Sequence, residues 1–215
     1  EPERRRVRPE LLEALKTQHN DIFSFSNWVR VVSYTHSLNP LSSAGSLLGY
    51  GGRFNPGIDL ERGTLSAWPA LYLSDDFETA FREKFQLPSD ADISGLRPHE
   101  LALQPQMSHV TILLQGRLLQ VFDATSPERF EPLARVLGKI KMPRRALELR
   151  KKLRISSSVL SMVASGKQLY DALLLHNWRE LPVQFELPAQ SQVVAELIRA
   201  AGFEAIMYSS TKNKG

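Results

Sequence analysis

The residues best suited to catalysis or ligand binding lie between positions 49 and 85, where a glycine-rich bend precedes a short apolar run and a helix-like segment. The bend carries Arg53, whose planar charged fork suits a phosphate. The glycines around it let the backbone turn sharply and approach a ligand closely. The apolar run carries Tyr72, and the segment after it carries Glu83. A cation, an aromatic ring and a carboxylate on successive elements suit a substrate with a pyrophosphate, a planar base and a labile sugar bond.

Two local elements are expected to position the tyrosine and the carboxylate. Residues 71–73 fit a β-strand, and Asp75 or Asp76 fits the N-cap of a helix that runs through Glu83. Arg82, next to Glu83 on this helix, points about 100° away and is expected to lie outside the site. Each residue alone also has an ordinary explanation, because Asn-Pro and Pro-Gly mark bends in many inert loops. Their order along the chain favours the chemical interpretation.

The order of these residues resembles that of the RES domain family, which is named for an arginine, a glutamate and a serine. The matching pieces are Trp28-Val-Arg30, Gly51-Gly-Arg-Phe-Asn55, Leu71-Tyr-Leu73, Glu83 and Tyr208-Ser-Ser210. The resemblance therefore covers about residues 28–212. The family pattern places a serine two residues after the tyrosine, which favours Ser210 over Ser209.

The resemblance implies an enzyme. Members of the family are mostly toxins of bacterial toxin–antitoxin pairs and are similar in fold to ADP-ribosyltransferases. We therefore expect cleavage of the nicotinamide–ribose bond of NAD⁺, with release of nicotinamide and growth arrest by NAD⁺ depletion. NAD⁺ would be the substrate and no cofactor is expected. The acceptor would be water in a glycohydrolase, or inorganic phosphate as a co-substrate in a phosphorylase.

Other functions stay open at this point. One alternative is a protein mono-ADP-ribosyltransferase toxin or a secreted antibacterial effector. Another is a non-catalytic basic module that binds a partner. The resemblance implies a cognate antitoxin, or an immunity protein if the chain is a delivered effector.

The resemblance also implies roles for individual residues. Bond cleavage builds positive charge on the ribose, so Glu83 would hold the ribose hydroxyls and stabilise this cation. Tyr72 would stack on the nicotinamide or line its slot. The expected catalytic residues are Glu83, Arg53 and Tyr72. The expected NAD⁺-binding residues are Arg30 and Arg53 at the phosphates, Tyr72, Ser210 and Asn55.

The composition is that of an ordinary globular chain. Of the 215 residues, 42% are hydrophobic and 23% are charged. No apolar run is long enough to cross a bilayer, and the first residues are charged. We therefore expect a cytoplasmic protein that acts on cytosolic NAD⁺. Delivery into a target cell stays open. The chain has no cysteine, which excludes disulfides and thiolate metal sites. The five histidines show no metal-ligand spacing, so no metal is expected.

The net charge of +4 raises the question of a nucleic-acid partner. The densest basic stretch, residues 139–154, carries leucines at helical spacing and predicts an amphipathic helix. Aromatic residues do not alternate with its charges, so direct nucleic-acid binding is not expected. A solvated helix face is the first interpretation of this stretch, and a docking surface for an acidic partner protein is the second.

The pattern of the whole chain predicts a single α+β domain, with mixed sheets and helical inserts. Helices are expected at 9–18, 127–137, 144–153, 165–175 and 190–201. Strands are expected at 28–34, 71–73, 110–114, 118–122 and 205–208, with a hairpin turn at 115–117 and a polar segment at 88–106. We expect residues 1–27 to form an N-terminal helical extension and residues 28–215 the RES domain. The family normally continues past the position of Gly215 into one more apolar strand, so the presence of that last strand is left open.

Overall fold

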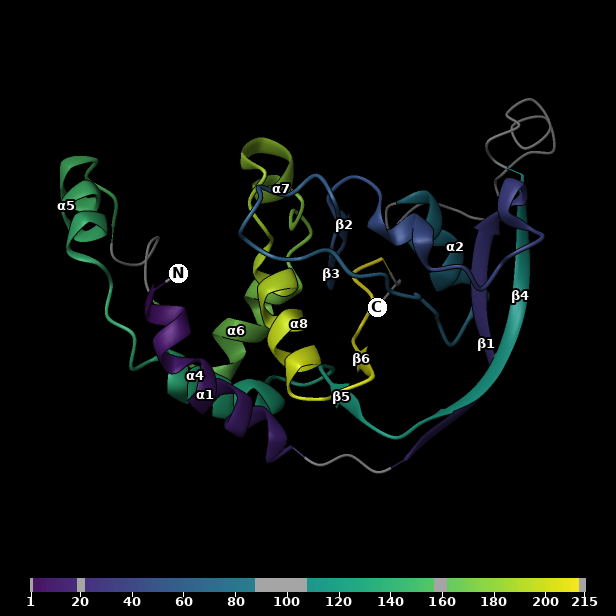
Figure 1. The fold of residues 1–215 in the computed structure, drawn as a ribbon, viewed down its shortest axis with the longest axis horizontal. Coiled ribbons are helices and arrows are strands. Elements are labelled where there is room, and N and C mark those ends of the chain that lie inside the picture. The colour runs from purple at the N-terminus through teal and green to yellow at the C-terminus, as the bar shows by residue number, and fades with distance from the viewer. Residues whose placement is uncertain (1, 19–21, 88–107, 157–161, 213–215) are drawn as a thin grey trace.

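The fold mixes helices and short sheets, in agreement with the predicted α+β class. The computed structural model describes residues 2–18, 22–87, 108–156 and 162–212. The polar segment predicted at 88–106 lies outside these residues. Figure 1 shows a helical part at one end, a long two-stranded ribbon at the other, and a central part between them. Within the described residues, no helix combines the length and the apolar character that crossing a membrane requires.

The larger hydrophobic core lies in the helical part. It is built by α1 (Pro2–Lys16), α4 (Glu131–Leu137), α6 (Gly166–Leu173) and α8 (Gln190–Ala200). Helix α1 starts earlier than predicted and buries Val7, Leu11 and Leu15, which share one face because they are four residues apart. It packs against α4 and α8, so the expected N-terminal extension contributes to the main core.

The long ribbon pairs β1 (Phe23–Ser33) with β4 (His109–Leu118) in antiparallel register. The hairpin turn predicted at 115–117 is wrong, because β4 continues through these residues. Gly116 leaves room for a cross-strand aromatic ring: a Cβ at this position would lie 2.7 Å from the ring of Phe25. The glycine therefore serves the packing of the ribbon rather than a turn.

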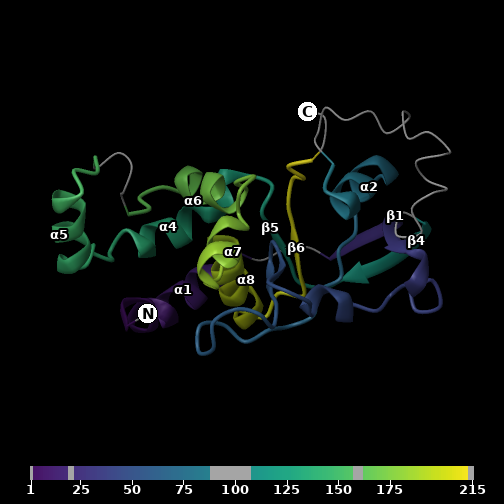
Figure 2. The same cartoon turned by 90° about the horizontal axis from the view of Figure 1, so that it is seen from above.

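Helix α2 (Phe77–Phe85) packs on this ribbon (Figures 1 and 2). Its Ala80 and Phe81 form a second, smaller core with Val29 and Val31 of β1. The helix begins after Asp76, whose side chain accepts a hydrogen bond from the Thr79 N–H at 2.8 Å. The predicted helix and one of its two candidate caps are thus confirmed.

Two further pairs of short strands connect these parts. The parallel pair joins β5 (Val121–Asp123) to β6 (Ala205–Met207), and the antiparallel pair joins β2 (Gly51–Gly52) to β3 (Asn55–Pro56). The predicted strand at 71–73 is wrong: nearby pairing is confined to a single bridge between Ser74 and Val29. The Tyr72 carbonyl accepts from the Arg30 side chain at 3.2 Å instead of from a neighbouring strand.

The remaining elements are short. They are the 3₁₀ helices η1 (Tyr34–His36), η2 (Ala44–Leu47) and η4 (Pro127–Phe130), and the helices α5 (Arg144–Lys152) and α7 (Glu180–Phe185). Helix α7 is not among the predicted elements. Helix α5 is confirmed, yet none of its residues is buried, and Leu149 is 49% exposed.

Candidate active site

Four segments bring the predicted site residues together, and the one that carries Ser210 lies 127 residues after Glu83. Arg53 lies in the turn between β2 and β3, Tyr72 in the extended segment before α2, and Glu83 on α2. Ser210 lies after β6, on the segment that runs from the central part towards α2 (Figures 1 and 2). Its hydroxyl donates to Glu83 Oε1 at 2.7 Å.

Glu83 is partly buried and is held from the C-terminal segment. The Ser210 hydroxyl that bonds to it also accepts from the Lys212 N–H at 3.1 Å, which folds the chain back at this point. Ser209 is exposed. Of the two candidate serines, Ser210 is therefore the one that the fold joins to the carboxylate.

Tyr72 is fixed by its hydroxyl, which donates to Asn55 Oδ1 at 2.8 Å and accepts from the Phe54 N–H at 3.2 Å. Burial raises the pKa of Tyr72 to about 12, although the Phe54 N–H opposes the shift. The phenol therefore stays neutral at physiological pH. Gly52 makes this placement possible, because a Cβ there would lie 2.4 Å from the Tyr72 hydroxyl oxygen.

Asn55 is 0% exposed and its amide is engaged inside the protein. Its Nδ2 donates to the carbonyls of Ser46 at 2.8 Å and Trp68 at 3.1 Å, and its Oδ1 also accepts from the Gly52 N–H at 3.1 Å. With these bonds Asn55 shapes the glycine-rich bend and positions the Tyr72 hydroxyl.

Gln192 on α8 is a second buried amide that holds the bend. Its Nε2 lies 2.8 Å from the Tyr50 carbonyl oxygen and 2.9 Å from that of Gly52. The sequence analysis missed this residue. The available signal was a polar side chain on the buried face of a regular amphipathic helix.

Arg53 is 7% exposed and ties three segments together. Its Nη1 donates to the carbonyls of Leu173 at 3.2 Å and Leu175 at 2.8 Å, and its Nη2 donates to Thr211 Oγ1 at 3.0 Å. Burial lowers the pKa of Arg53, while Tyr208, Glu83 and Tyr72 act in the opposite direction. The guanidinium therefore lies within electrostatic range of the predicted carboxylate and of two phenols.

Arg30 holds the segment that carries Tyr72. Its Nε donates to the Pro40 carbonyl at 2.8 Å, its Nη1 to that of Tyr72 at 3.2 Å, and its Nη2 to that of Ser42 at 3.0 Å. Burial lowers the pKa of Arg30. Both predicted phosphate-binding arginines thus direct most of their donors to the protein itself.

Tyr208 is a further member of the cluster. Its ring packs against Phe54 at a centroid distance of 4.7 Å. Burial raises the pKa of Tyr208 far above its usual value, and Tyr72 and Glu83 raise it further. Together with Tyr72 it provides a neutral aromatic wall beside the carboxylate. The signal was present in the sequence, where Tyr208 begins the Tyr-Ser-Ser motif.

Arg82, the neighbour of Glu83 on α2, is buried and bonded inside the protein. It is 0% exposed, and its Nη2 and Nε donate to Glu78 Oε1 at 2.6 and 2.9 Å. The side chain that was expected to point away from the site is therefore buried, because α2 turns this side of the helix towards the interior of the protein.

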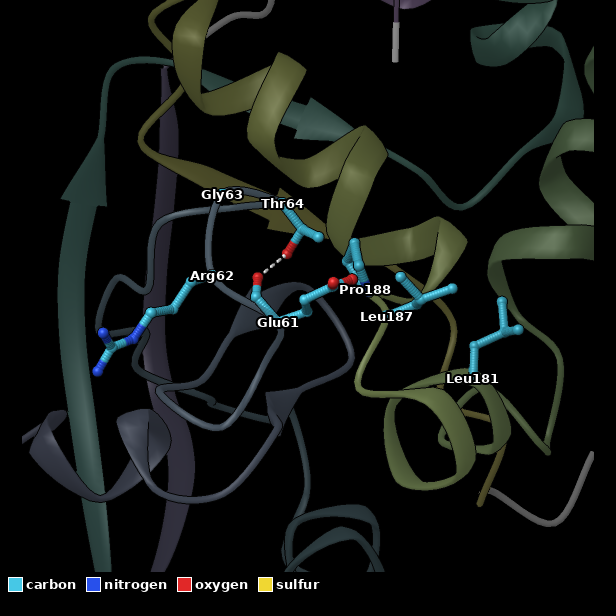
Figure 3. Close-up of a pocket in the computed structure, with 7 residues that line it drawn as sticks. All are labelled: Glu61, Arg62, Gly63, Thr64, Leu181, Leu187 and Pro188. Carbon is cyan, nitrogen blue, oxygen red and sulfur yellow. Dashed lines mark hydrogen bonds between the residues drawn. The ribbon is translucent and has the colours of Figure 1, made fainter.

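A hollow of about 510 Å³ lies elsewhere, between the loop after β3 and the turn from α7 to α8. It is lined by Glu61, Arg62, Gly63, Thr64, Leu181, Leu187 and Pro188 (Figure 3). None of the predicted site residues contributes to it. Figure 3 shows that the Arg62 side chain points away from the other lining residues, and the Thr64 hydroxyl bonds to the Glu61 carbonyl. The hollow has no convergent charged groups, so the Glu83 cluster is the better candidate for catalysis.

The described residues contain no group of three or more histidine, aspartate or glutamate side chains placed to hold a metal ion. A family model described as the RES domain matches residues 28–215, most of the chain. No curated protein and no solved structure gave a significant match. The expected likeness to the ADP-ribosyltransferase fold therefore stays a prediction. The matched region begins inside β1, five residues after the strand starts at Phe23.

Proposed function

Because the chain belongs to the RES domain family, we propose that it is an enzyme that cleaves the nicotinamide–ribose bond of NAD⁺. At the level of the family, the RES domain indicates an NAD-related function within toxin–antitoxin systems. The observation that carries the proposal is the Glu83 carboxylate bonded to Ser210 and within electrostatic range of Arg53 and two neutral phenols.

The reaction needs little proton transfer at the leaving group. When the bond between the ribose carbon and the nicotinamide nitrogen breaks, both bonding electrons leave with nicotinamide, which departs as a neutral molecule. Positive charge then develops on the ribose. A carboxylate that is already oriented stabilises this cation without reorganising, and Glu83 is oriented by the Ser210 hydroxyl. We assign to Glu83 the ribose face of the substrate.

The phenols suit the nicotinamide side. Tyr72 and Tyr208 are neutral at physiological pH, as ordinary tyrosines are, and burial raises the pKa of both further. They present aromatic surface to a planar base without adding a charge that would trap the cation. NAD⁺ is the substrate in this proposal and not a bound cofactor.

The acceptor divides the proposal into two reactions. Water attacking the ribose carbon gives ADP-ribose and releases one proton, as in a glycohydrolase. Inorganic phosphate attacking the same carbon gives a phosphorylated ADP-ribose, as in a phosphorylase. Transfer to a protein side chain is the alternative outcome of the same bond cleavage.

In the proposed function, the protein is a toxin that acts on cytosolic NAD⁺, and a cognate antitoxin restrains it. NAD⁺ depletion would arrest growth. The exposed basic helix α5 supports docking of an acidic partner away from the Glu83 cluster.

The test measures nicotinamide release from NAD⁺ by the purified chain in three mixtures: buffer alone, added inorganic phosphate, and added bacterial protein. Release in buffer indicates a hydrolase, dependence on phosphate a phosphorylase, and dependence on protein with label incorporation a transferase. Absence of release in all three mixtures from a folded chain would refute the proposal. Glu83→Gln is the matched inactive control.

A further inference from the structure

The two arginines expected to bind phosphates are largely occupied. Arg53 donates to two carbonyls and to Thr211, and Arg30 donates to three carbonyls. A phosphate that took over these donors would leave one buried and several partly buried carbonyl oxygens without these partners, which is unfavourable. The anionic part of a dinucleotide therefore needs another cation near the cluster.

Arg179 meets this requirement. It is exposed, and its guanidinium lies over the Trp178 ring at 5.1 Å from the centroid. Among the residues that the structure describes, Arg179 donates no hydrogen bond and forms no ion pair. The adjacent carboxylate, Glu180, accepts from Asn177 Nδ2 at 2.7 Å instead. The donors of Arg179 are thus available to a ligand.

The position of Arg179 is tied to the candidate active site. Arg53 lies over the same Trp178 ring, at 5.7 Å from its centroid, so the indole lies close to both cations. The carbonyls of Leu173 and Leu175 that Arg53 holds belong to the segment leading into Trp178. Burial has the largest effect on both pKa values, lowering that of Arg53 and raising that of Tyr72, and the positive charge of Arg179 lowers both.

We propose that Arg179, oriented by the Trp178 ring, binds a phosphate group at the edge of the Glu83 cluster. This inference rests on the proposed function for the identity of the ligand. The phosphate belongs either to the pyrophosphate of NAD⁺ or to inorganic phosphate acting as the acceptor. In both cases Arg53 is the buried support of the site and Arg179 is its ligand-facing cation.

The test compares Arg179→Gln with a matched control, Arg199→Gln. Arg199 is also exposed and lies over a tryptophan, Trp68, at 5.4 Å from the ring centroid. The control therefore loses the same charge and the same kind of contact at another position. Binding is measured by calorimetry with three probes: ADP-ribose, inorganic phosphate and nicotinamide riboside. Circular dichroism verifies that both variants are folded.

We expect Arg179→Gln to weaken binding of one phosphate probe by about tenfold to a hundredfold, as for the loss of one charge-assisted hydrogen bond. Binding of nicotinamide riboside should be unchanged, because it carries no phosphate. A loss with ADP-ribose assigns Arg179 to the pyrophosphate, with a raised KM for NAD⁺ and kcat within about twofold. A loss with inorganic phosphate alone assigns it to the acceptor. Arg179→Lys should recover only part of the affinity, because lysine lacks the planar fork.

Two negative results remain distinguishable. Wild-type affinity of Arg179→Gln for both phosphate probes would overturn the inference even if the enzyme releases nicotinamide. Equal losses in Arg179→Gln and Arg199→Gln would also overturn it, since they indicate only a general charge effect. Failure of the wild-type chain to release nicotinamide would overturn the proposed function. The binding measurements with ADP-ribose and inorganic phosphate would still decide the role of Arg179.

Discussion

Replacing Glu83 with glutamine separates chemistry from folding at the centre of the candidate site. The amide keeps the shape of the side chain and still offers an oxygen to the Ser210 hydroxyl, which now donates to Glu83 Oε1 at 2.7 Å. Weakening this one hydrogen bond should cost about 1 kcal/mol or less in the free energy of unfolding. Removing a preorganised charge from the transition state should cost about 3–4 kcal/mol, a factor of about 10²–10³ in kcat. The effect on rate should therefore far exceed the effect on stability.

The assay is steady-state nicotinamide release, with ADP-ribose affinity and urea unfolding measured on the same preparations. We expect Glu83→Gln to lower kcat by at least about a hundredfold while affinity and unfolding midpoint change little. A kcat within about threefold of wild type, or an effect confined to KM, would refute a transition-state role for Glu83.

A second glutamate on the same helix provides the contrast. Glu78 accepts from the fully buried Arg82 at 2.6 Å. Glu78→Gln weakens one of the interactions of a buried cation, so we expect a loss of about 1–3 kcal/mol in the free energy of unfolding. The kcat of the folded fraction should stay near that of wild type. The same chemical change five residues apart should thus give opposite readouts.

The remaining predictions concern Arg53, the basic helix and the tyrosines. Arg53→Lys should lower both the unfolding midpoint in urea and nicotinamide release, because an ammonium cannot reproduce the bonds from two guanidinium nitrogens to three acceptors. Reversing Arg150, Lys151 and Lys152 of α5 to glutamate should leave nicotinamide release within about a few-fold, since exposed charges are screened beyond roughly 10 Å at 0.1 M salt. The same reversal should slow association with an acidic partner in a surface-binding experiment. For Tyr72, the unfolded chain ionises near pH 10 whereas the folded protein keeps the proton to about pH 12. Its contribution to stability is therefore complete below pH 10 and falls by about 1.4 kcal/mol per pH unit above it, and a urea series should show a shallower decline in Tyr72→Phe.

Local signals in the sequence were sufficient for part of this fold. The cap at Asp76 and the helix through Glu83 were predictable because one short segment contains both the capping side chain and the helical residues. The strand at Ala205–Met207 was also predicted, although its partner strand β5 lies far away in the sequence. Ser210 could be chosen over Ser209 from the spacing of a motif, and the structure joins Ser210 to the carboxylate.

The errors concern features whose cause lies far away in the chain. Gly116 looks like a turn residue, but its lack of a side chain is used by the ring of Phe25 on the partner strand. The run around Tyr72 has the composition of a strand, but the Tyr72 carbonyl accepts from the Arg30 side chain instead of from a neighbouring strand. The Tyr72 hydroxyl accepts from the Phe54 N–H. Neither partner can be identified from the local residue pattern.

The arginines show the same limit in functional terms. Their types and order led to the prediction of the site, but their partners are mainly backbone carbonyls, and every residue has one of those. For Arg53 two of these carbonyls are 120 and 122 residues away. Trp178 and Arg179 carried no motif at all, and they lie near the candidate site because Arg53 lies over the Trp178 ring.

The contacts of Arg30 and Arg53 within the protein change how substitutions in the site should be interpreted. A loss of activity in Arg53 or Arg30 variants is expected even if neither guanidinium touches a phosphate, because each one joins segments that carry other site residues. Such a loss therefore cannot identify the phosphate-binding group. Arg179 holds no other segment by a hydrogen bond among the described residues, so its removal tests ligand contact with little change in the framework. A phosphate contact is best assigned to the arginine whose loss weakens phosphate binding while the unfolding midpoint stays constant.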